Sequence, residues 1–262
     1  ELTRFAQRLG QGNFATSSMD YKDAELAALA ASMNKAAVQL DQYDKEQKVF
    51  FQNVSHELRT PLQVIRNHAE GIQHGILNTD KSSSVIIHES DRLGDMVEDL
   101  LYLSRIDAMS PGRRFELADL REILSNSAER QGSLAAQKGI DYIFDFDLDP
   151  VEFFCDEPGM VRAFDNLIAN ALRYAKSQII LVCKKAEDRI EVAVVDDGQG
   201  FSSEDLPHVF QRFYKGKGGD HGIGLAIVQA VVAQHGGVVD AHNDGGAIIT
   251  MSFPQGERDG TA

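Results

Sequence analysis

The chain has 262 residues, a length typical of about two domains. Hydrophobic residues make up 43% and charged residues 25%, as in ordinary globular proteins, and the net charge of −14 argues against a general nucleic-acid binder, which would present a basic face. Cys155 and Cys183 lie in apolar stretches without metal-ligand spacing. They predict buried thiols, not a disulfide framework.

The sequence contains no run of about 18 apolar residues, so it predicts no membrane-spanning helix, and it shows no signal peptide. It begins at Glu1, within a helical pattern and without an initiator Met. We therefore expect the chain to be part of a longer protein.

Residues 1–44 are rich in helix-forming residues. Leu26, Leu29 and Met33 recur at helical spacing between residues 21 and 51, after a break at residues 10–14. With the segment Leu9-Gly10-Gln11-Gly12-Asn13-Phe14, this pattern resembles the later part of a HAMP linker domain. The resemblance implies a partial HAMP-like linker and signalling helix. An alanine-rich coiled-coil lead-in is the alternative.

Residues 45–109 predict an antiparallel helical hairpin. Val54, Leu58, Ile65 and Ile72 form a heptad-like apolar seam, and residues 86, 93 and 100 form another. Between them, the Gly, Asn, Asp and Ser residues of the segment 75–84 predict a turn. One hairpin cannot bury both seams well, so we expect a homodimer that forms a four-helix bundle.

The first helix of this hairpin contains the segment Ser55-His56-Glu57-Leu58-Arg59-Thr60-Pro61-Leu62. The helical advance of about 100° per residue turns His56 away from the seam, so its imidazole is predicted to be exposed, largely neutral and able to attack an electrophile. Glu57 can orient the ring or accept its proton, and Thr60 lies one turn further on the same face. Pro61 lacks an N–H and is expected to interrupt the helix. A single exposed histidine is usually inert. The prediction that His56 is reactive therefore depends on the whole eight-residue segment.

This segment resembles the phosphoacceptor box of sensor histidine kinases. The resemblance implies that His56 is the phosphorylated residue, that Glu57 is the assisting base and that Thr60 is needed for phosphatase activity.

Residues 113–256 differ in composition from the hairpin, and Ser110-Pro111-Gly112 is the expected boundary between the two. Helices and strands mix here without strict βαβ alternation, which predicts an α/β sandwich with helices on one sheet face. Helices are expected over residues 119–137, 157–174 and 223–235, and strands over residues 140–146, 179–184, 190–195, 238–241 and 248–253.

Asn166 and Asn170 are one turn apart on the second of these helices, and Arg173 falls near the same face. Side-chain oxygens suit Mg²⁺, and a guanidinium suits phosphate. Without other support, the same pattern describes an amphipathic helix with two polar surface amides.

Asp196, Gly198 and Gly200 follow a predicted strand. A carboxylate at a strand end can accept from an exocyclic amine, and glycines let the backbone approach a flat base because they lack Cβ. A generic turn would use the same residue types.

A basic, glycine-rich stretch at residues 216–219 precedes Gly222-Ile223-Gly224-Leu225, which opens a helix. Backbone N–H groups at a helix N-terminus bind anions, and the preceding stretch has the length of a lid that closes over a triphosphate.

With the segment Val209-Phe210-Gln211-Arg212-Phe213-Tyr214-Lys215, which precedes the basic stretch, these elements occur in the order of the N, G1, F and G2 boxes of the GHKL ATPases, the group that includes histidine kinases, Hsp90, gyrase B and MutL. The similarity covers about residues 50–254, and residues 243–247 match the last glycine segment of the family loosely. It implies a Bergerat-type ATP-binding domain in which Asp196 binds the adenine amino group and Asn166 and Asn170 hold Mg²⁺ and phosphate.

The implied ATP-binding residues are Asn166, Asn170, Arg173, Tyr174, Asp196, Gly198, Gly200, Arg212, Phe213, Lys215, Gly222, Gly224 and Leu225. Arg212 and Lys215 would reach the phosphates from the lid. Asp220 stands at the position, two residues before Gly222, where the family often has a further glycine, and Arg173 stands where many members have lysine.

The sequence as a whole predicts the cytoplasmic portion of a sensor histidine kinase, joined to the membrane only through segments outside this chain. We expect ATP-dependent autophosphorylation of His56 with Mg²⁺, within or between subunits, and transfer to an aspartate of a response regulator receiver domain. Two alternatives stay open: an ATP-binding scaffold without kinase activity, and an ATPase that closes as a clamp, in which the His56 segment would have no role.

Overall fold

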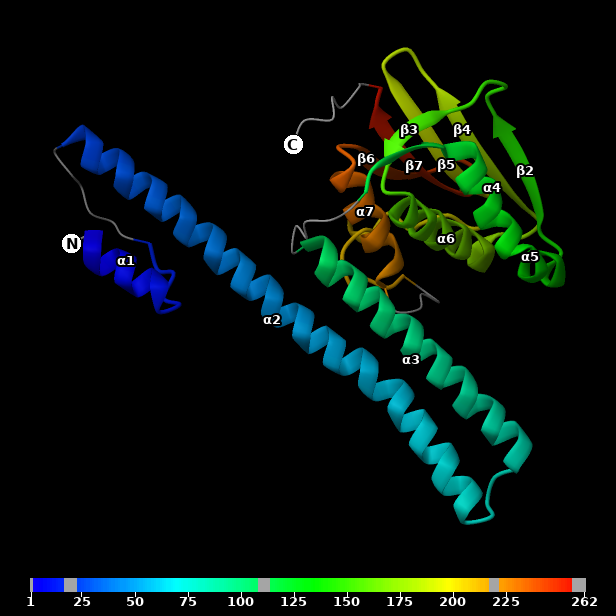
Figure 1. Ribbon diagram of the computed structural model, residues 1–262. Coiled ribbons are helices and arrows are strands. Elements are labelled where there is room, and N and C mark those ends of the chain that lie inside the picture. The colour runs from blue at the N-terminus through cyan, green and yellow to red at the C-terminus, as the bar shows by residue number, and fades with distance from the viewer. Residues whose placement is uncertain (1, 17–22, 108–113, 217–221, 256–262) are drawn as a thin grey trace.

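The computed structural model describes residues 2–16, 23–107, 114–216 and 222–255. Helix α1 (Leu2–Gly10) precedes two long helices, α2 (Ala24–Gln73) and α3 (Thr79–Asp107), which lie antiparallel and side by side (Figure 1). The sheet domain lies near the C-terminal end of α3 (Figure 1). The predicted order of a helical hairpin followed by an α/β domain is confirmed; the expected boundary at 110–112 lies outside the described residues.

Helix α2 begins at the N-cap Asp23, whose carboxylate accepts from the Glu25 N–H at 2.9 Å. The helix is continuous across residues 44 and 45, where a domain division was expected, and it also passes through Pro61. The predicted interruption at Pro61 is therefore wrong. A proline removes one backbone hydrogen bond, and the many turns on either side of Pro61 keep this 50-residue helix continuous.

The turn between α2 and α3 is shorter than the predicted segment 75–84, because α3 already begins at Thr79. The Asn78 side chain accepts from the Lys81 N–H at 3.0 Å and so satisfies a free donor of the first helical turn. Ser84 lies inside the helix, where its hydroxyl donates to the Asp80 carbonyl at 3.0 Å. The serines at residues 82–84 led to the prediction of a turn. The Asn78 cap instead starts α3 at Thr79, so these serines lie inside the helix.

The C-terminal domain contains a five-stranded sheet of order β2-β4-β5-β7-β6, in which β2 and β4 are parallel and the other neighbours are antiparallel. A second, two-stranded sheet pairs β1 with β3. The elements are β1 Glu116–Asp119, α4 Leu120–Arg130, α5 Gly132–Lys138, β2 Asp141–Phe146, β3 Glu152–Cys155, α6 Glu157–Tyr174, β4 Gln178–Lys185, β5 Arg189–Asp196, the short 3-10 helix η1 Leu206–His208, α7 Gly224–Gln234, β6 Val238–Asn243 and β7 Ala247–Pro254.

The five predicted strands are all present, within two residues of the expected bounds. The helix predicted over residues 119–137 is divided into α4 and α5 at Gln131. Here the Gln131 side chain donates to the Asp165 carbonyl on α6 at 3.1 Å, and Gly132 follows. A contact with another element and a poor helix former thus separate the two helices. The short strands β1 and β3 were not predicted.

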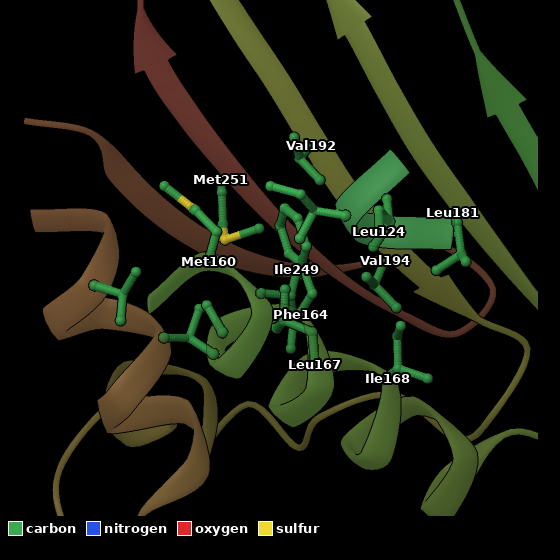
Figure 2. Close-up of a cluster of buried hydrophobic side chains, with 14 of the residues drawn as sticks. Leu124, Met160, Phe164, Leu167, Ile168, Leu181, Val192, Val194, Ile249 and Met251 are labelled. Atoms are coloured by element: carbon green, nitrogen blue, oxygen red, sulfur yellow. The ribbon is translucent and has the colours of Figure 1, made fainter. Parts of the chain in front are cut away.

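The core lies between one sheet face and the helices α4, α6 and α7. Alternate residues of β5 and β7 face the apolar side of α6 in Figure 2. Val194 and Ile249 are cross-strand partners on the face toward Phe164 and Leu167. Complete burial of side chains of this size stabilises the fold by about 1.5–3 kcal/mol each. The packing fixes α6, and with it every side chain on the opposite face of that helix.

The helical hairpin and the sheet domain share an interface. Met96 and Leu103 of α3 are fully or almost fully buried and belong to the same apolar cluster as α6 and α7. Arg162 of α6 forms an ion pair with Asp99 of α3 at 2.8 Å and lies over the Tyr102 ring, 4.8 Å from its centroid. These contacts hold α3 opposite the face of α6 that points away from the sheet.

Candidate functional site

A cavity of about 1540 Å³ separates α3 from the sheet domain. Nine of the sequence-predicted residues line it: Asn166, Asn170, Arg173, Tyr174, Gly200, Lys215, Gly222, Gly224 and Leu225. The α3 side contributes several charged side chains that the sequence did not suggest, among them Glu89, Asp95, Glu98 and Asp99. The cavity is large enough for a nucleotide, since small-molecule pockets occupy roughly 300–1,000 Å³.

Two amides from α6 face this cavity, one helical turn apart. Helix α6 starts after Asp156 with a proline in its first turn, as predicted. The Asn166 Nδ2 donates to the Arg162 carbonyl at 2.9 Å, which leaves Oδ1 toward Gly224 at the start of α7. Asn166 and Asn170 therefore offer side-chain oxygens to the cavity, and that of Asn166 lies beside the start of α7. These donors fit Mg²⁺, which takes one or two protein oxygens and completes its shell with water and phosphate.

Asp196 ends β5 and is 5% exposed. Its Oδ1 accepts from the Gly198 N–H at 2.8 Å and from the Ala247 N–H at 3.4 Å. Burial raises the pKa of Asp196, and these two hydrogen bonds oppose the rise. Asp196 does not line the cavity itself but contacts Ala247, which does. One carboxylate oxygen is thus committed to the backbone.

The neighbouring Asp197 has a different environment. Its carboxylate accepts from the N–H groups of Lys176 and Ser177 and from the Ser177 hydroxyl, at 2.6–3.1 Å. Desolvation raises its pKa, but the hydrogen bonds from Ser177 and Lys176 outweigh desolvation and lower the pKa overall. Asp197 therefore connects the loop after β5 to the residues before β4. The sequence did not reveal this role, because it gives no way to distinguish the two adjacent aspartates.

One side of the cavity is formed by the end of the segment 212–216 and the start of α7. Gly222 has a φ of 68°, and a Cβ there would lie 2.5 Å from the Tyr214 carbonyl oxygen. Only glycine fits this position without strain. The Phe213 N–H donates to the Gly222 carbonyl at 2.6 Å, so this hydrogen bond joins the residues that flank the predicted lid at residues 216–219. The basic stretch 217–219 and Asp220 lie outside the described residues.

His56 on α2 is exposed, as the helical phase predicted. Thr60 Oγ1 donates to the His56 carbonyl at 3.4 Å. Glu57 forms an ion pair with Lys215 of the lid segment, with 2.5 Å between Oε2 and Nζ. The structure thus brings together a predicted base and a predicted phosphate ligand, while His56 itself does not line the cavity.

Arg212 and Phe213 also lie at α2 and not in the cavity. The Arg212 guanidinium is 5.9 Å from the centroid of the Phe50 ring, and the rings of Phe50 and Phe213 are 5.5 Å apart. Gly198 is buried against the Tyr174 carbonyl and does not line the cavity either. Four predicted nucleotide residues, Asp196, Gly198, Arg212 and Phe213, are therefore outside the cavity surface in this arrangement.

These features define a class of protein: a nucleotide-binding sheet domain joined to a helical hairpin that carries an exposed histidine. Two family models match the chain. Residues 46–108 match the His Kinase A (phospho-acceptor) domain, and residues 155–257 match the histidine kinase-, DNA gyrase B- and HSP90-like ATPase. The chain belongs to the sensor histidine kinases of two-component systems.

One curated relative supports this assignment, and two solved structures have a similar fold. The chain is 30% identical to the signal transduction histidine-protein kinase BaeS of Escherichia coli (strain K12) over 96% of its own length and 56% of BaeS. Its fold is similar to that of the Acinetobacter baumannii histidine kinase AdeS, with a TM-score of 0.68 and 24% identity over 77% of this chain and 98% of that one. It is also similar to histidine kinase ThkA, solved in complex with the response regulator protein TrrA, with a TM-score of 0.67 and 18% identity over 84% and 68% of the two chains.

The chain spans about half the length of the curated relative BaeS. Among the residues that the structure describes, no helix is both long enough and apolar enough to cross a membrane.

Proposed function

We propose that this chain uses Mg²⁺-ATP to phosphorylate His56 and then transfers the phosphoryl group to an aspartate of a response regulator. The observation that carries this proposal is the combination, in one chain, of an exposed histidine followed by Glu57 with a cavity that Asn166 and Asn170 line. The first supplies a nucleophile, and the second supplies ligands for the phosphate donor.

The proposed reaction forms a bond between an imidazole nitrogen of His56 and the γ-phosphorus of ATP, and it breaks the bond from that phosphorus to the oxygen of ADP. Neutral imidazole has the necessary lone pair, and Glu57 would hold the proton of the other ring nitrogen. Mg²⁺ bound by Asn166 and Asn170 would neutralise phosphate charge. Lys215 would contribute a positive charge from the lid segment.

The arrangement of the two domains within this chain does not by itself bring His56 to the cavity. His56 does not line the cavity, and Glu57 is engaged by Lys215. The sheet domain would therefore move relative to the hairpin, or the phosphoryl group would pass between the subunits of a homodimer, whose four-helix bundle we also propose. Residues 1–44 would act as a HAMP-like signalling segment, in a longer protein anchored at the cytoplasmic face of a membrane.

Labelling with γ-labelled ATP and Mg²⁺ tests the phosphoacceptor. We expect label that is labile in acid and stable in base, as for phosphohistidine, and we expect none in His56→Gln. His74→Gln is the matched control, since His74 is also exposed and lies at the end of the same helix. Label retained in His56→Gln would refute the assignment, and ATP binding without label in the wild type would indicate a scaffold.

Phosphotransfer is tested by adding a purified receiver domain to the labelled protein. The similarity to ThkA, which was solved with the response regulator protein TrrA, supports the choice of partner. Label should move to the receiver domain and become labile in base, as an acyl phosphate is. If label stays on His56 with every receiver domain of the source genome, the second half of the proposal is wrong.

A further inference from the structure

The turn between β6 and β7 contacts both ends of the loop that follows β5. At the start of this loop, the Ala247 N–H donates to the Asp196 carboxylate at 3.4 Å. Gly246 packs directly on the Asp196 backbone, and a Cβ at Gly246 would overlap the Asp196 carbonyl oxygen. The β6–β7 turn therefore limits where the Asp196 carboxylate can lie.

At the other end of the loop, the side chain of Asn243 pairs with the backbone of Phe201 in both directions. The Phe201 N–H donates to Asn243 Oδ1 at 2.9 Å, and Asn243 Nδ2 donates to the Phe201 carbonyl at 2.7 Å. The reversed amide would place donor against donor and acceptor against acceptor, so the contact has one orientation. The same Oδ1 lies against Gly200.

Gly200 and Phe201 line the cavity, whereas Asn243 does not. Asn243 is itself exposed, and its two hydrogen bonds with the Phe201 backbone lie at the surface. The segment 197–201 has no helix or strand hydrogen bonds of its own, and its shape depends on such side-chain contacts.

We propose that Asn243 is a positioning residue for adenine recognition. It fixes the cavity wall at Gly200 and Phe201, and with it the position of the base relative to Asp196, whose carboxylate contacts the cavity-lining Ala247. This inference rests on the proposed function, since it assumes that ATP occupies the cavity. It assigns Asn243 an effect on selectivity for the base and none on the phosphate ligands Asn166 and Asn170.

Titration calorimetry with two nucleotides separates this role from a structural one. We would compare Mg²⁺-ATP with the triphosphate of purine riboside, which lacks the 6-amino group, for the wild type, Asn243→Ala and Asn243→Asp. The Kd of ATP should rise about 10-fold in the variants, the effect of one lost hydrogen bond, and the Kd of the purine nucleotide by less than roughly twofold. His242→Ala, a change at an exposed neighbour on the same strand, should alter neither value.

Hydrogen exchange in the nucleotide-free protein supplies a second measurement. The Phe201 amide should exchange about 10-fold faster in Asn243→Ala than in the wild type, because its acceptor is gone. Equal weakening of both nucleotides, retained preference for ATP or unchanged exchange at Phe201 would each overturn the inference. A wild type that binds no ATP would overturn the proposed function instead, and the two failures are thus distinct.

Discussion

Replacing Asp196 by Asn should change stability and nucleotide affinity in opposite directions. Burial raises the pKa of Asp196, which means that ionisation of this carboxylate opposes folding at neutral pH. An uncharged amide of nearly the same shape removes this opposition. Its Oδ1 can still accept from the Gly198 and Ala247 N–H groups, as the carboxylate does at 2.8 and 3.4 Å. We therefore expect the free energy of unfolding without nucleotide to stay equal or to rise.

The same orientation would impair ATP binding. Because Oδ1 is committed to the backbone, Nδ2 takes the place of the second carboxylate oxygen and presents a donor to the adenine amine, which is also a donor. A hydrogen bond to a charged acceptor contributes about 1.5–3 kcal/mol, so its loss corresponds to about a 10- to 150-fold rise in the Kd of Mg²⁺-ATP.

Asp197→Asn is the matched control, because the adjacent acid faces Lys176 and Ser177. Hydrogen bonds lower the pKa of Asp197 overall, so its ionised form favours folding, and the amide should destabilise the domain at neutral pH with little change in affinity. Urea unfolding and titration calorimetry measure the two effects. The reasoning would be refuted if Asp196→Asn bound ATP like the wild type, or if its affinity fell only together with its stability.

Three further predictions concern other parts of the chain. Thr60→Ala should keep autophosphorylation and lose dephosphorylation of the phosphorylated receiver domain; loss of both activities would contradict the proposed division. Lys215→Met should weaken ATP binding. It should change the free energy of unfolding, measured with urea, by less than about 1 kcal/mol, because the ion pair with Glu57 is partly exposed. Arg121 lowers the pKa of Asp119 by direct hydrogen bonding, so this contribution to stability is present at neutral pH and is lost as the pH falls below about 4. Arg121→Met should therefore be less stable at pH 7 and lose less further stability on acidification, as measured by urea unfolding at several pH values.

The parts of the fold that the sequence predicted have strong local patterns. Strands β4 and β5 are eight-residue runs rich in β-branched apolar residues, and α6 has an aspartate before its first turn, an early proline and a regular apolar face. Strands β1 and β3 have four residues each and pair with one another across more than 30 residues of chain. Four residues give too short a pattern to distinguish a strand from a loop, so only tertiary pairing defines β1 and β3.

The same distinction holds for the site. The exposure of His56 follows from the phase of one helix, and the facing pair Asn166 and Asn170 follows from the spacing on another. The contact of Lys215 with Glu57 joins residues 158 apart in sequence, and the pairing of Asn243 with Phe201 joins residues 42 apart. No local pattern encodes either contact.

The ion pair between Glu57 and Lys215 connects the two domains. In the proposed reaction these two groups have different partners, the imidazole of His56 for Glu57 and the phosphates of ATP for Lys215. Both side chains are 24–30% exposed, so the pair contributes about 0–1 kcal/mol and cannot by itself hold the sheet domain in place. The buried contacts of Met96 and Leu103 with the sheet domain contribute more, because each side chain is almost completely removed from water. A signal that changes the packing of α3 would therefore act on the stronger contacts. The release of Glu57 beside His56 would then follow from movement of the domain, and the phosphates of ATP would replace Glu57 as the partner of Lys215.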